Sequence, residues 1–152
     1  MDNMDEIDKN IIYVLRKDSS RSISKLAKYL GIPRTTLKNR INRLEKQGVI
    51  KGYKAVLDWE KIGYPLCNYV HLSITRGGKG GGPTELAASL AKIDNVEEVH
   101  EITGRWDIIA KVRMKKITDL TDMLENKQTG LVKIHPAFRT ESMLVIKSSK
   151  ED

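Results

Sequence analysis

The sequence predicts an α+β protein with an all-helical first half and a βαββαβ second half. Three observations predict this division. Up to residue 46, apolar residues recur three and four positions apart, a spacing typical of amphipathic helices. From residue 66 on, segments in which apolar and polar residues alternate are interleaved with two helical patterns. The charge is also divided unequally, since residues 1–66 hold 14 Lys and Arg against 8 Asp and Glu, whereas residues 67–152 hold 13 against 12.

The first half contains three segments with helical spacing, which are residues 5–17, 23–30 and 34–46. Ser22 suits the N-cap of the second helix, and Gly31 suits the position just past its end. Pro33 fits the first turn of the third helix, where its missing N–H costs nothing, and Gly48 ends that helix. Two helices joined by a short turn with a glycine form a helix-turn-helix, whose second helix enters the DNA major groove.

The third helix has an apolar face and an opposite face that is polar and basic. Leu37, Ile41 and Leu44 lie on the apolar face, which we expect to pack in a core. A basic face that is merely solvated is the alternative to DNA binding, because most charged helix faces carry no function. The residues that we expect to contact DNA are Arg34, Thr35, Thr36, Lys38, Asn39, Asn42, Arg43 and Lys46.

Side-chain chemistry divides these residues between two kinds of DNA contact. Thr35, Asn39 and Asn42 can pair with base edges in the major groove. The Lys and Arg side chains donate to phosphates, and Arg34 also lies close enough to the helix start to reach a base. Arg40 lies nearer the apolar face, so either a salt bridge with a neighbouring helix or a phosphate contact is open to it.

The segment after the third helix predicts a wing. Val49–Leu57 alternates loosely and contains Gly52, so it is either a strand–turn–strand wing or a single strand. The helices and this segment together predict a winged helix-turn-helix, and the basic excess of this half favours a polyanion such as DNA. A membrane surface would also attract it, but no apolar stretch approaches about 20 residues and no signal peptide is visible. We therefore expect a soluble, cytoplasmic protein without a membrane partner.

The second half predicts the ferredoxin-like fold, a four-stranded antiparallel sheet with two helices on one face. Its predicted strands and helices, in chain order, are residues 66–75, 84–93, 96–103, 106–114, 117–126 and 138–147. The two middle strands are joined by a tight turn at Gly104-Arg105. We expect the second face of the sheet to be apolar and to be completed by dimerisation. The predicted domains are residues 1–57 and 67–152, with a linker over 58–66.

No group of residues predicts an enzyme. His71, His100 and His135 are far apart and follow no metal-binding spacing, so no metal or cofactor is expected. The adjacent acids Glu97 and Glu98 should face opposite sides of a strand. The single cysteine, Cys67, lies in a strand pattern and is better explained as a buried small residue than as a nucleophile. The glycine-rich TRGGKGGGPT lacks the Lys-Ser/Thr ending of a phosphate-binding loop.

The chain resembles the Lrp/AsnC, or feast/famine, family of transcriptional regulators. The resemblance rests on MDEIDKNIIYVL, SISKLAKYLGIPRTTLKNRINRLEKQGVIKGYKAVLD, KIGYP and VEEVHEITGRWDIIAKV, and it covers nearly the whole chain. It implies an N-terminal DNA-binding domain and a C-terminal RAM-type domain that dimerises, assembles dimers into larger discs and binds a small effector, commonly an amino acid. The effector residues that it implies are Glu101, Thr103, Gly104, Asp107, Thr140 and Ser142.

Two kinds of alternative stay open. Asp107 either accepts from an effector ammonium or only caps the turn, and Gly104 either serves a ligand or only provides a positive φ angle. The segment KQTGLVKIHPAF lacks the Pro-Gly-Val turn common in relatives, and Arg105 stands where relatives often carry an acid. The rival functions are an architectural DNA-compacting protein and an amino-acid-binding subunit without gene-specific regulation. The ratio of specific to nonspecific DNA affinity separates the first rival from a regulator.

Overall fold

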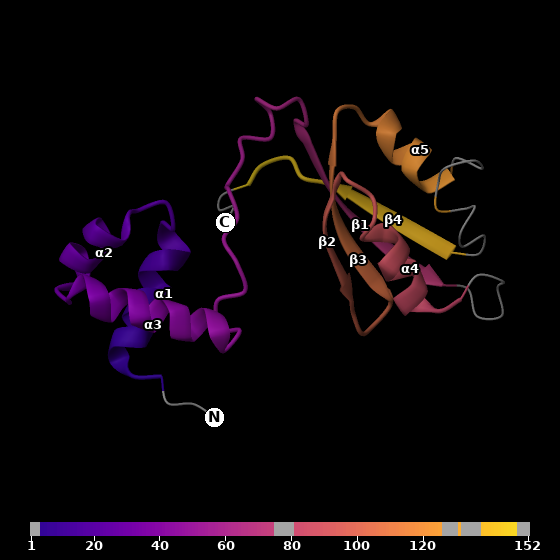
Figure 1. The fold of residues 1–152 in the computed structure, drawn as a ribbon. Helices are drawn as coiled ribbons and strands as arrows, with labels where there is room; N and C mark the ends of the chain where they lie inside the picture. Colours follow the sequence, from indigo (N-terminus) through magenta and orange to yellow (C-terminus); the bar gives the residue numbers. More distant parts are fainter. Residues whose placement is uncertain (1–3, 75–80, 126–130, 132–137, 149–152) are drawn as a thin grey trace. The chain divides into compact units, whose positions relative to one another are not determined.

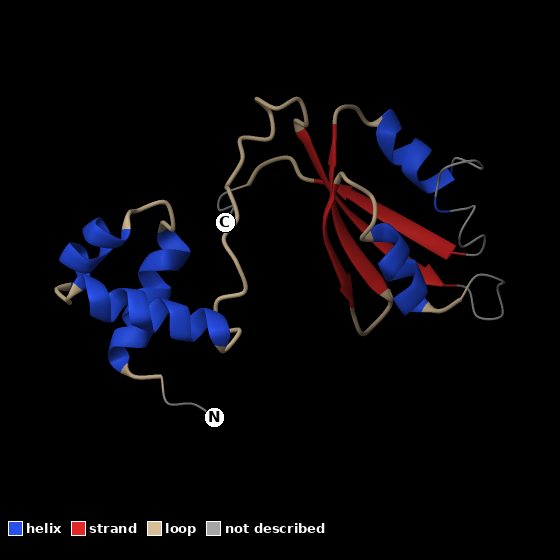
Figure 2. Cartoon of the chain, in the orientation of Figure 1, coloured by secondary structure: helices blue, strands red, loops and turns tan. Residues whose placement is uncertain are grey.

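The computed structural model describes residues 4–74, 81–125, 131 and 138–148 (Figure 1). The chain divides into two compact units, Met1–Ala55 and Val56–Asp152. Each unit has its own cluster of buried apolar side chains. The α+β class is confirmed, because the first unit is helical and the second contains a sheet (Figure 2).

The first unit consists of three helices at the predicted positions. They are α1 (Glu6–Lys17), α2 (Ile23–Leu30) and α3 (Arg34–Lys46). The side chain of Ser22 accepts a hydrogen bond from the Lys25 N–H, and Gly31 lies beyond the end of α2 with φ of 66°, so both caps are confirmed. The helices enclose a core made of Ile11, Val14, Leu26, Ala27, Leu37, Ile41 and Leu44.

The predicted wing does not form strands. The backbone N–H groups of Val49 and Ile50 both donate to the Leu44 carbonyl, at 2.9 and 3.2 Å, and the residues that follow belong to no strand. A strand needs a neighbouring strand to accept its backbone hydrogen bonds, and none of the described residues supplies one here. The segment is instead tied to α3 by the Tyr53 hydroxyl, which donates to the Glu45 carboxylate at 2.9 Å. Partial burial is the main cause that raises the pKa of Tyr53, and the hydrogen bond to Glu45 raises it further.

The second unit has the predicted βαββαβ order. Its elements are β1 (Leu66–Ile74), α4 (Pro83–Leu90), β2 (Val96–Glu101), β3 (Ile108–Met114), α5 (Thr118–Glu125) and β4 (Phe138–Leu144). The sheet order is β2-β3-β1-β4 and every neighbouring pair is antiparallel, which is the ferredoxin-like topology (Figures 1 and 2). The β2–β3 connection is longer than predicted, because the Ile102 N–H already donates to the Asp107 carbonyl and closes a turn over residues 102–107.

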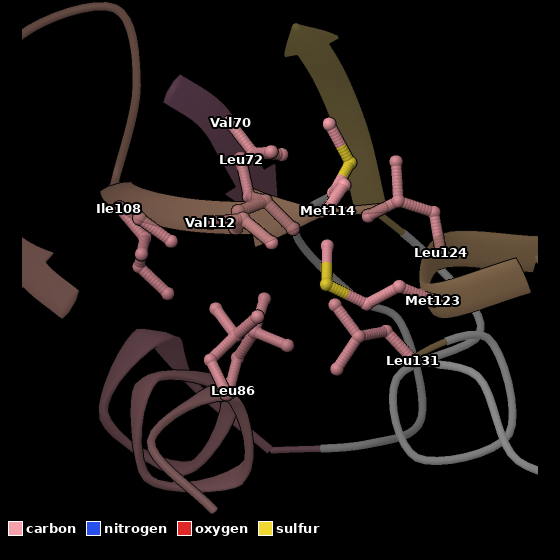
Figure 3. Close-up of a cluster of buried hydrophobic side chains, with 11 residues drawn as sticks. Val70, Leu72, Leu86, Ile108, Val112, Met114, Met123, Leu124 and Leu131 are labelled. Atoms are coloured by element: carbon pink, nitrogen blue, oxygen red, sulfur yellow. The ribbon is translucent and has the colours of Figure 1, made fainter. Parts of the chain in front are cut away.

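One face of this sheet forms the core with both helices (Figure 3). Side chains of β1 and β3 meet Leu86 and Leu90 of α4 and Met123 and Leu124 of α5. The strand contribution comes from alternate positions, as a half-buried sheet requires. These strand residues are Val70, Leu72, Ile108, Ala110, Val112 and Met114. The prediction of two helices on one face is therefore confirmed.

The other face of the sheet, called the open face below, is mixed and not uniformly apolar as predicted. Between the core positions, β3 places Lys111 and Arg113 there. The Glu97 carboxylate lies 2.8 Å from Arg113 Nε and 3.2 Å from Lys111 Nζ, and the Arg113 guanidinium lies over the Trp59 ring at 5.0 Å. Charged residues thus share this face with the apolar side chains of Tyr69, Ile109 and Met143.

A β-bulge in β2 corrects a second expectation. Glu97 and Glu98 do not face opposite sides, because the register shifts between Val96 and Glu98 and both carboxylates lie within 4.0 Å of Lys111 Nζ.

Cys67 is buried as predicted. None of the described helices is long and apolar enough to cross a membrane. Within the described ranges, no group of three or more His, Cys, Asp or Glu could hold a metal ion.

Candidate nucleic-acid interface and ligand cavity

The α3 helix presents the polar face that its sequence predicts. Leu37, Ile41 and Leu44 are buried, which leaves the opposite side of the helix in solvent. A shallow hollow of about 470 Å³ on this helix is lined by Asn39, Asn42, Arg43, Lys46 and Gln47. The sequence-predicted DNA residues are all exposed except Thr36, which is half-buried; they are Arg34, Thr35, Thr36, Lys38, Asn39, Asn42, Arg43 and Lys46.

Two arginines of α3 are held by acids of the first helix. Arg40 Nη1 lies 2.6 Å from Asp5 Oδ2 and 2.9 Å from Asp8 Oδ1, so the salt bridge, one of the two alternatives for Arg40, forms. Arg43 Nη2 also pairs with Asp8, whose side chain is fully buried. The hydrogen bond from Arg40 is the main cause that lowers the pKa of Asp5 and raises that of Arg40. The ion pair of Arg43 was not predicted from the sequence, because helical spacing alone does not reveal the partner on α1.

Asp107, the central residue of the predicted effector site, is bonded to the end of β1. Its Oδ2 accepts from the Ser73 hydroxyl at 3.0 Å and from the Ile74 N–H at 2.8 Å. Asp107 therefore has a structural role, but it holds the end of β1 and does not cap its own turn as the sequence suggested. Gly104 lies in the 102–107 turn with φ of 121°, a conformation that L side chains rarely adopt.

The other predicted effector residues do not all meet at one place. Thr103 lies with Gly104 in the turn, whereas Glu101 accepts from the Thr84 hydroxyl at the start of α4. Thr140 pairs with Leu72 and Ser142 pairs with Val70 across the β1–β4 ladder. Because directly opposed residues share a face, these two lie on the helix-covered side of the sheet. The open face carries their strand neighbours instead.

A cavity of about 330 Å³ lies beside the turn and includes only one residue of the predicted effector set, Thr140. The others that line it are Ser73, Arg105, Trp106, Arg139 and Glu141. The alternation of β4 could have indicated that Arg139 and Glu141 share a face, but their neighbours follow from the strand register, which the sequence alone does not reveal.

Comparison with known proteins assigns each unit separately. Residues 4–51 match a family model described as winged helix-turn-helix DNA-binding, and residues 69–152 match one described as the Lrp/AsnC ligand binding domain. The HTH-type transcriptional regulator FL11 of Pyrococcus horikoshii is 34% identical over 149 residues, covering 97% of this chain and 93% of that protein. The FL11 regulator of Pyrococcus furiosus is 33% identical over 148 residues, with coverage of 97% and 93%.

Solved structures of similar fold agree with this family assignment. A feast or famine regulatory protein from M. tuberculosis complexed with L-methionine has a TM-score of 0.82 and 25% identity, covering 97% of this chain and 95% of that one. A transcriptional regulator from Neisseria meningitidis in complex with L-methionine shares the fold, with a TM-score of 0.84 at 21% identity and coverage of 98% and 94%. The two matching models and the similarity along nearly the whole chain show that this protein belongs to the Lrp/AsnC family of transcriptional regulators.

Proposed function

We propose that this chain binds specific DNA sequences as a homo-oligomer and that an amino acid modulates this binding. The observation that carries the proposal is the exposed polar face of α3, which lies opposite its buried Leu37, Ile41 and Leu44. A helix whose back is held in a core can place a polar front in the major groove. The proposed compartment is the cytoplasm.

The roles of the α3 residues follow from their chemistry and their partners. Thr35, Asn39 and Asn42 reach base edges, whereas Arg34, Lys38 and Lys46 bind phosphates, with Thr36 at the flank. Arg43 takes a phosphate with the nitrogens that do not face Asp8, so its contribution is smaller than that of an arginine without an acidic partner.

A homodimer is the smallest assembly that the proposal requires. Two recognition helices related by a two-fold axis meet successive major-groove faces about one helical turn apart, so the preferred site is roughly palindromic. Dimers of dimers or an octamer place more recognition helices on one DNA and raise the overall affinity without new contacts. An amino acid that binds one assembly better than another shifts the equilibrium among them and thereby changes DNA binding.

The region around the 102–107 turn is the proposed effector site. Two similar solved structures contain L-methionine, which supports an amino acid as the class of ligand. Glu101, Thr103, Gly104, Asp107, Thr140 and Ser142 remain the proposed set from the sequence. Thr140 also lines the cavity of about 330 Å³ beside this turn.

Selection of bound sequences from random DNA at physiological salt tests the proposed DNA specificity. We expect enrichment of a roughly palindromic motif that is bound at least 10³ times more tightly than random DNA. Enrichment of no motif, with tight binding to every sequence, would instead favour the architectural DNA-compacting protein. Binding to no DNA at all would leave only the amino-acid-binding subunit.

A melting scan of the full chain with each of the twenty amino acids tests the effector. A ligand present at 100 times its dissociation constant should stabilise the folded state by about 2.7 kcal/mol. If no amino acid changes the melting temperature, the effector part of the proposal is wrong, while the DNA selection stands by its own result.

A further inference from the structure

The cavity beside the 102–107 turn is lined by two arginines, one glutamate and one tryptophan. Arg105, Arg139, Glu141 and Trp106 all line its volume of about 330 Å³. A volume of this size lies at the lower end of the range found for small-molecule sites. The lining therefore has the size and the mixed chemistry of a site for a small charged ligand.

Strand register places part of this lining on one face of the sheet. Arg139 is directly opposite Ser73, and Glu141 is directly opposite His71, across the β1–β4 ladder. Opposed residues in antiparallel strands share a face, and residues two apart on one strand do so as well. The Arg139 and Glu141 side chains therefore belong to the open face, with the His71 ring 6.1 Å from that of Trp106.

Neither Arg105 nor Arg139 has an acidic partner in the described part of the chain. Arg40, Arg43 and Arg113, by contrast, each pair with a carboxylate at 2.9 Å or less. The Arg105 guanidinium carbon lies 5.2 Å from the centroid of the Trp106 ring, which orients its planar donors without neutralising them. Both guanidinium groups thus retain their hydrogen-bond donors for a ligand.

The partners of Asp107 decide which acid faces the ligand. Asp107 Oδ2 already accepts from the Ser73 hydroxyl and the Ile74 N–H. Glu141 is exposed on β4 and lines the cavity, so it is better placed than Asp107 to accept from a ligand ammonium. Glu141 therefore takes the role of ammonium acceptor that the sequence suggested for Asp107.

We propose that this cavity binds an acidic amino acid, an inference that rests on the amino-acid effector of the proposed function. L-Aspartate and L-glutamate carry two carboxylates and one ammonium, which match the two guanidinium groups and the single carboxylate of the lining. A guanidinium binds a carboxylate through two parallel hydrogen bonds, so each arginine selects for one ligand carboxylate. A neutral amino acid leaves one guanidinium without an anionic partner.

Calorimetric titration of the full chain with L-aspartate, L-glutamate, L-asparagine and L-glutamine tests the proposal. We expect one of the acids to bind at least tenfold more tightly than its amide, which has nearly the same shape without the second charge. Arg139→Gln and Arg105→Gln should each weaken binding of that acid tenfold or more. Arg139→Lys keeps the charge and loses the planar fork. Its affinity for the acid should therefore lie between that of the unchanged chain and that of Arg139→Gln. Lys92→Gln removes one exposed positive charge outside the cavity and serves as the matched control.

The outcomes separate this inference from the function on which it rests. Equal binding of acid and amide, or unchanged binding by Arg139→Gln, would overturn the acidic class and leave an amino-acid effector in place. Binding of none of the twenty amino acids would remove both. Far-ultraviolet circular dichroism of each variant without ligand checks its fold, and a loss shared by Lys92→Gln would show a general charge effect and overturn the assignment to this cavity.

Discussion

The buried Asp8 carboxylate of α1 lies 2.9 Å from Nη1 of Arg40 on α3 and so joins the first helix to the recognition helix. The same carboxylate pairs with Arg43, and Asp5 adds a second contact to Arg40 at 2.6 Å. A buried acid beside two arginines orients α3 by charge as well as by its apolar face. These ion pairs therefore help to position α3, the helix proposed to contact DNA.

Asp8→Asn should destabilise the first unit by about 1–3 kcal/mol, because it removes the charge that two arginines share in a buried position. Both arginine side chains keep some access to water, which holds the loss below that of a fully buried pair. Urea unfolding, monitored through the helical signal, measures this loss of stability. Glu6→Gln, on the same helix but exposed and 3.6 Å from Lys9, should change stability by less than about 0.5 kcal/mol. Equal effects of the two substitutions would contradict the role of Asp8.

The Asp5 carboxyl should titrate below its ordinary pKa of 3.8, chiefly because Arg40 donates a hydrogen bond to it. A pKa lower in the folded than in the unfolded state stabilises the fold above the unfolded value. This contribution is lost as the pH falls through the folded-state pKa. Carboxyl-carbon NMR should follow this titration, and Arg40→Gln should move the midpoint up towards 3.8. A midpoint that does not respond to Arg40→Gln would contradict the assignment.

Asn39→Ala should weaken binding to the selected DNA site by about 1–3 kcal/mol and relax the sequence preference, because it removes a base contact. Lys38→Ala, on the same helix and also exposed, is the matched comparison. It should weaken binding to all sequences alike and lower the slope of log affinity against log salt by about one. Fluorescence anisotropy over a range of salt concentrations measures both. An unchanged affinity of Asn39→Ala for the selected site would show that Asn39 reads no base.

Asp107→Ala should cost the second unit about 1–3 kcal/mol without any ligand, because the Ile74 N–H and the Ser73 hydroxyl lose their acceptor. Asp107→Asn should cost less, since an amide oxygen can still accept from Ile74. Thermal melting measures the losses, with exposed Asp122→Ala on α5 as the control. If Asp107→Ala lowers stability no more than Asp122→Ala, the structural role of Asp107 is refuted.

Gly104→Ala should destabilise the second unit by about 1–3 kcal/mol, since φ is 121° at this position and alanine adopts such an angle only under strain. No atom lies within 4 Å of the added Cβ, so the backbone angle alone produces the loss. Gly52→Ala, which also meets nothing within 4 Å and has no positive φ, should be neutral or slightly stabilising. Similar melting temperatures for the two variants would argue against strain at Gly104.

Much of the fold follows from local patterns that can be recognised in the sequence. The caps at Ser22 and Gly31 and the apolar spacing of Leu37, Ile41 and Leu44 predict the recognition helix and its polar front. The βαββαβ order follows in the same way, because helical and strand periodicities differ. These features depend on residues a few positions apart, so the sequence by itself determined them.

Contacts between residues far apart in the chain were decided only by the tertiary structure. The pairing of Arg43 with Asp8 and the bulge beside Glu97 depend on which segments become neighbours. So does the absence, among the described residues, of a strand that pairs with Val49–Leu57. The register that sets Arg139 against Ser73 is of the same kind. A shift of one residue would move every β4 side chain to the other face of the sheet, and packing of the whole unit, not any local pattern, excludes that shift.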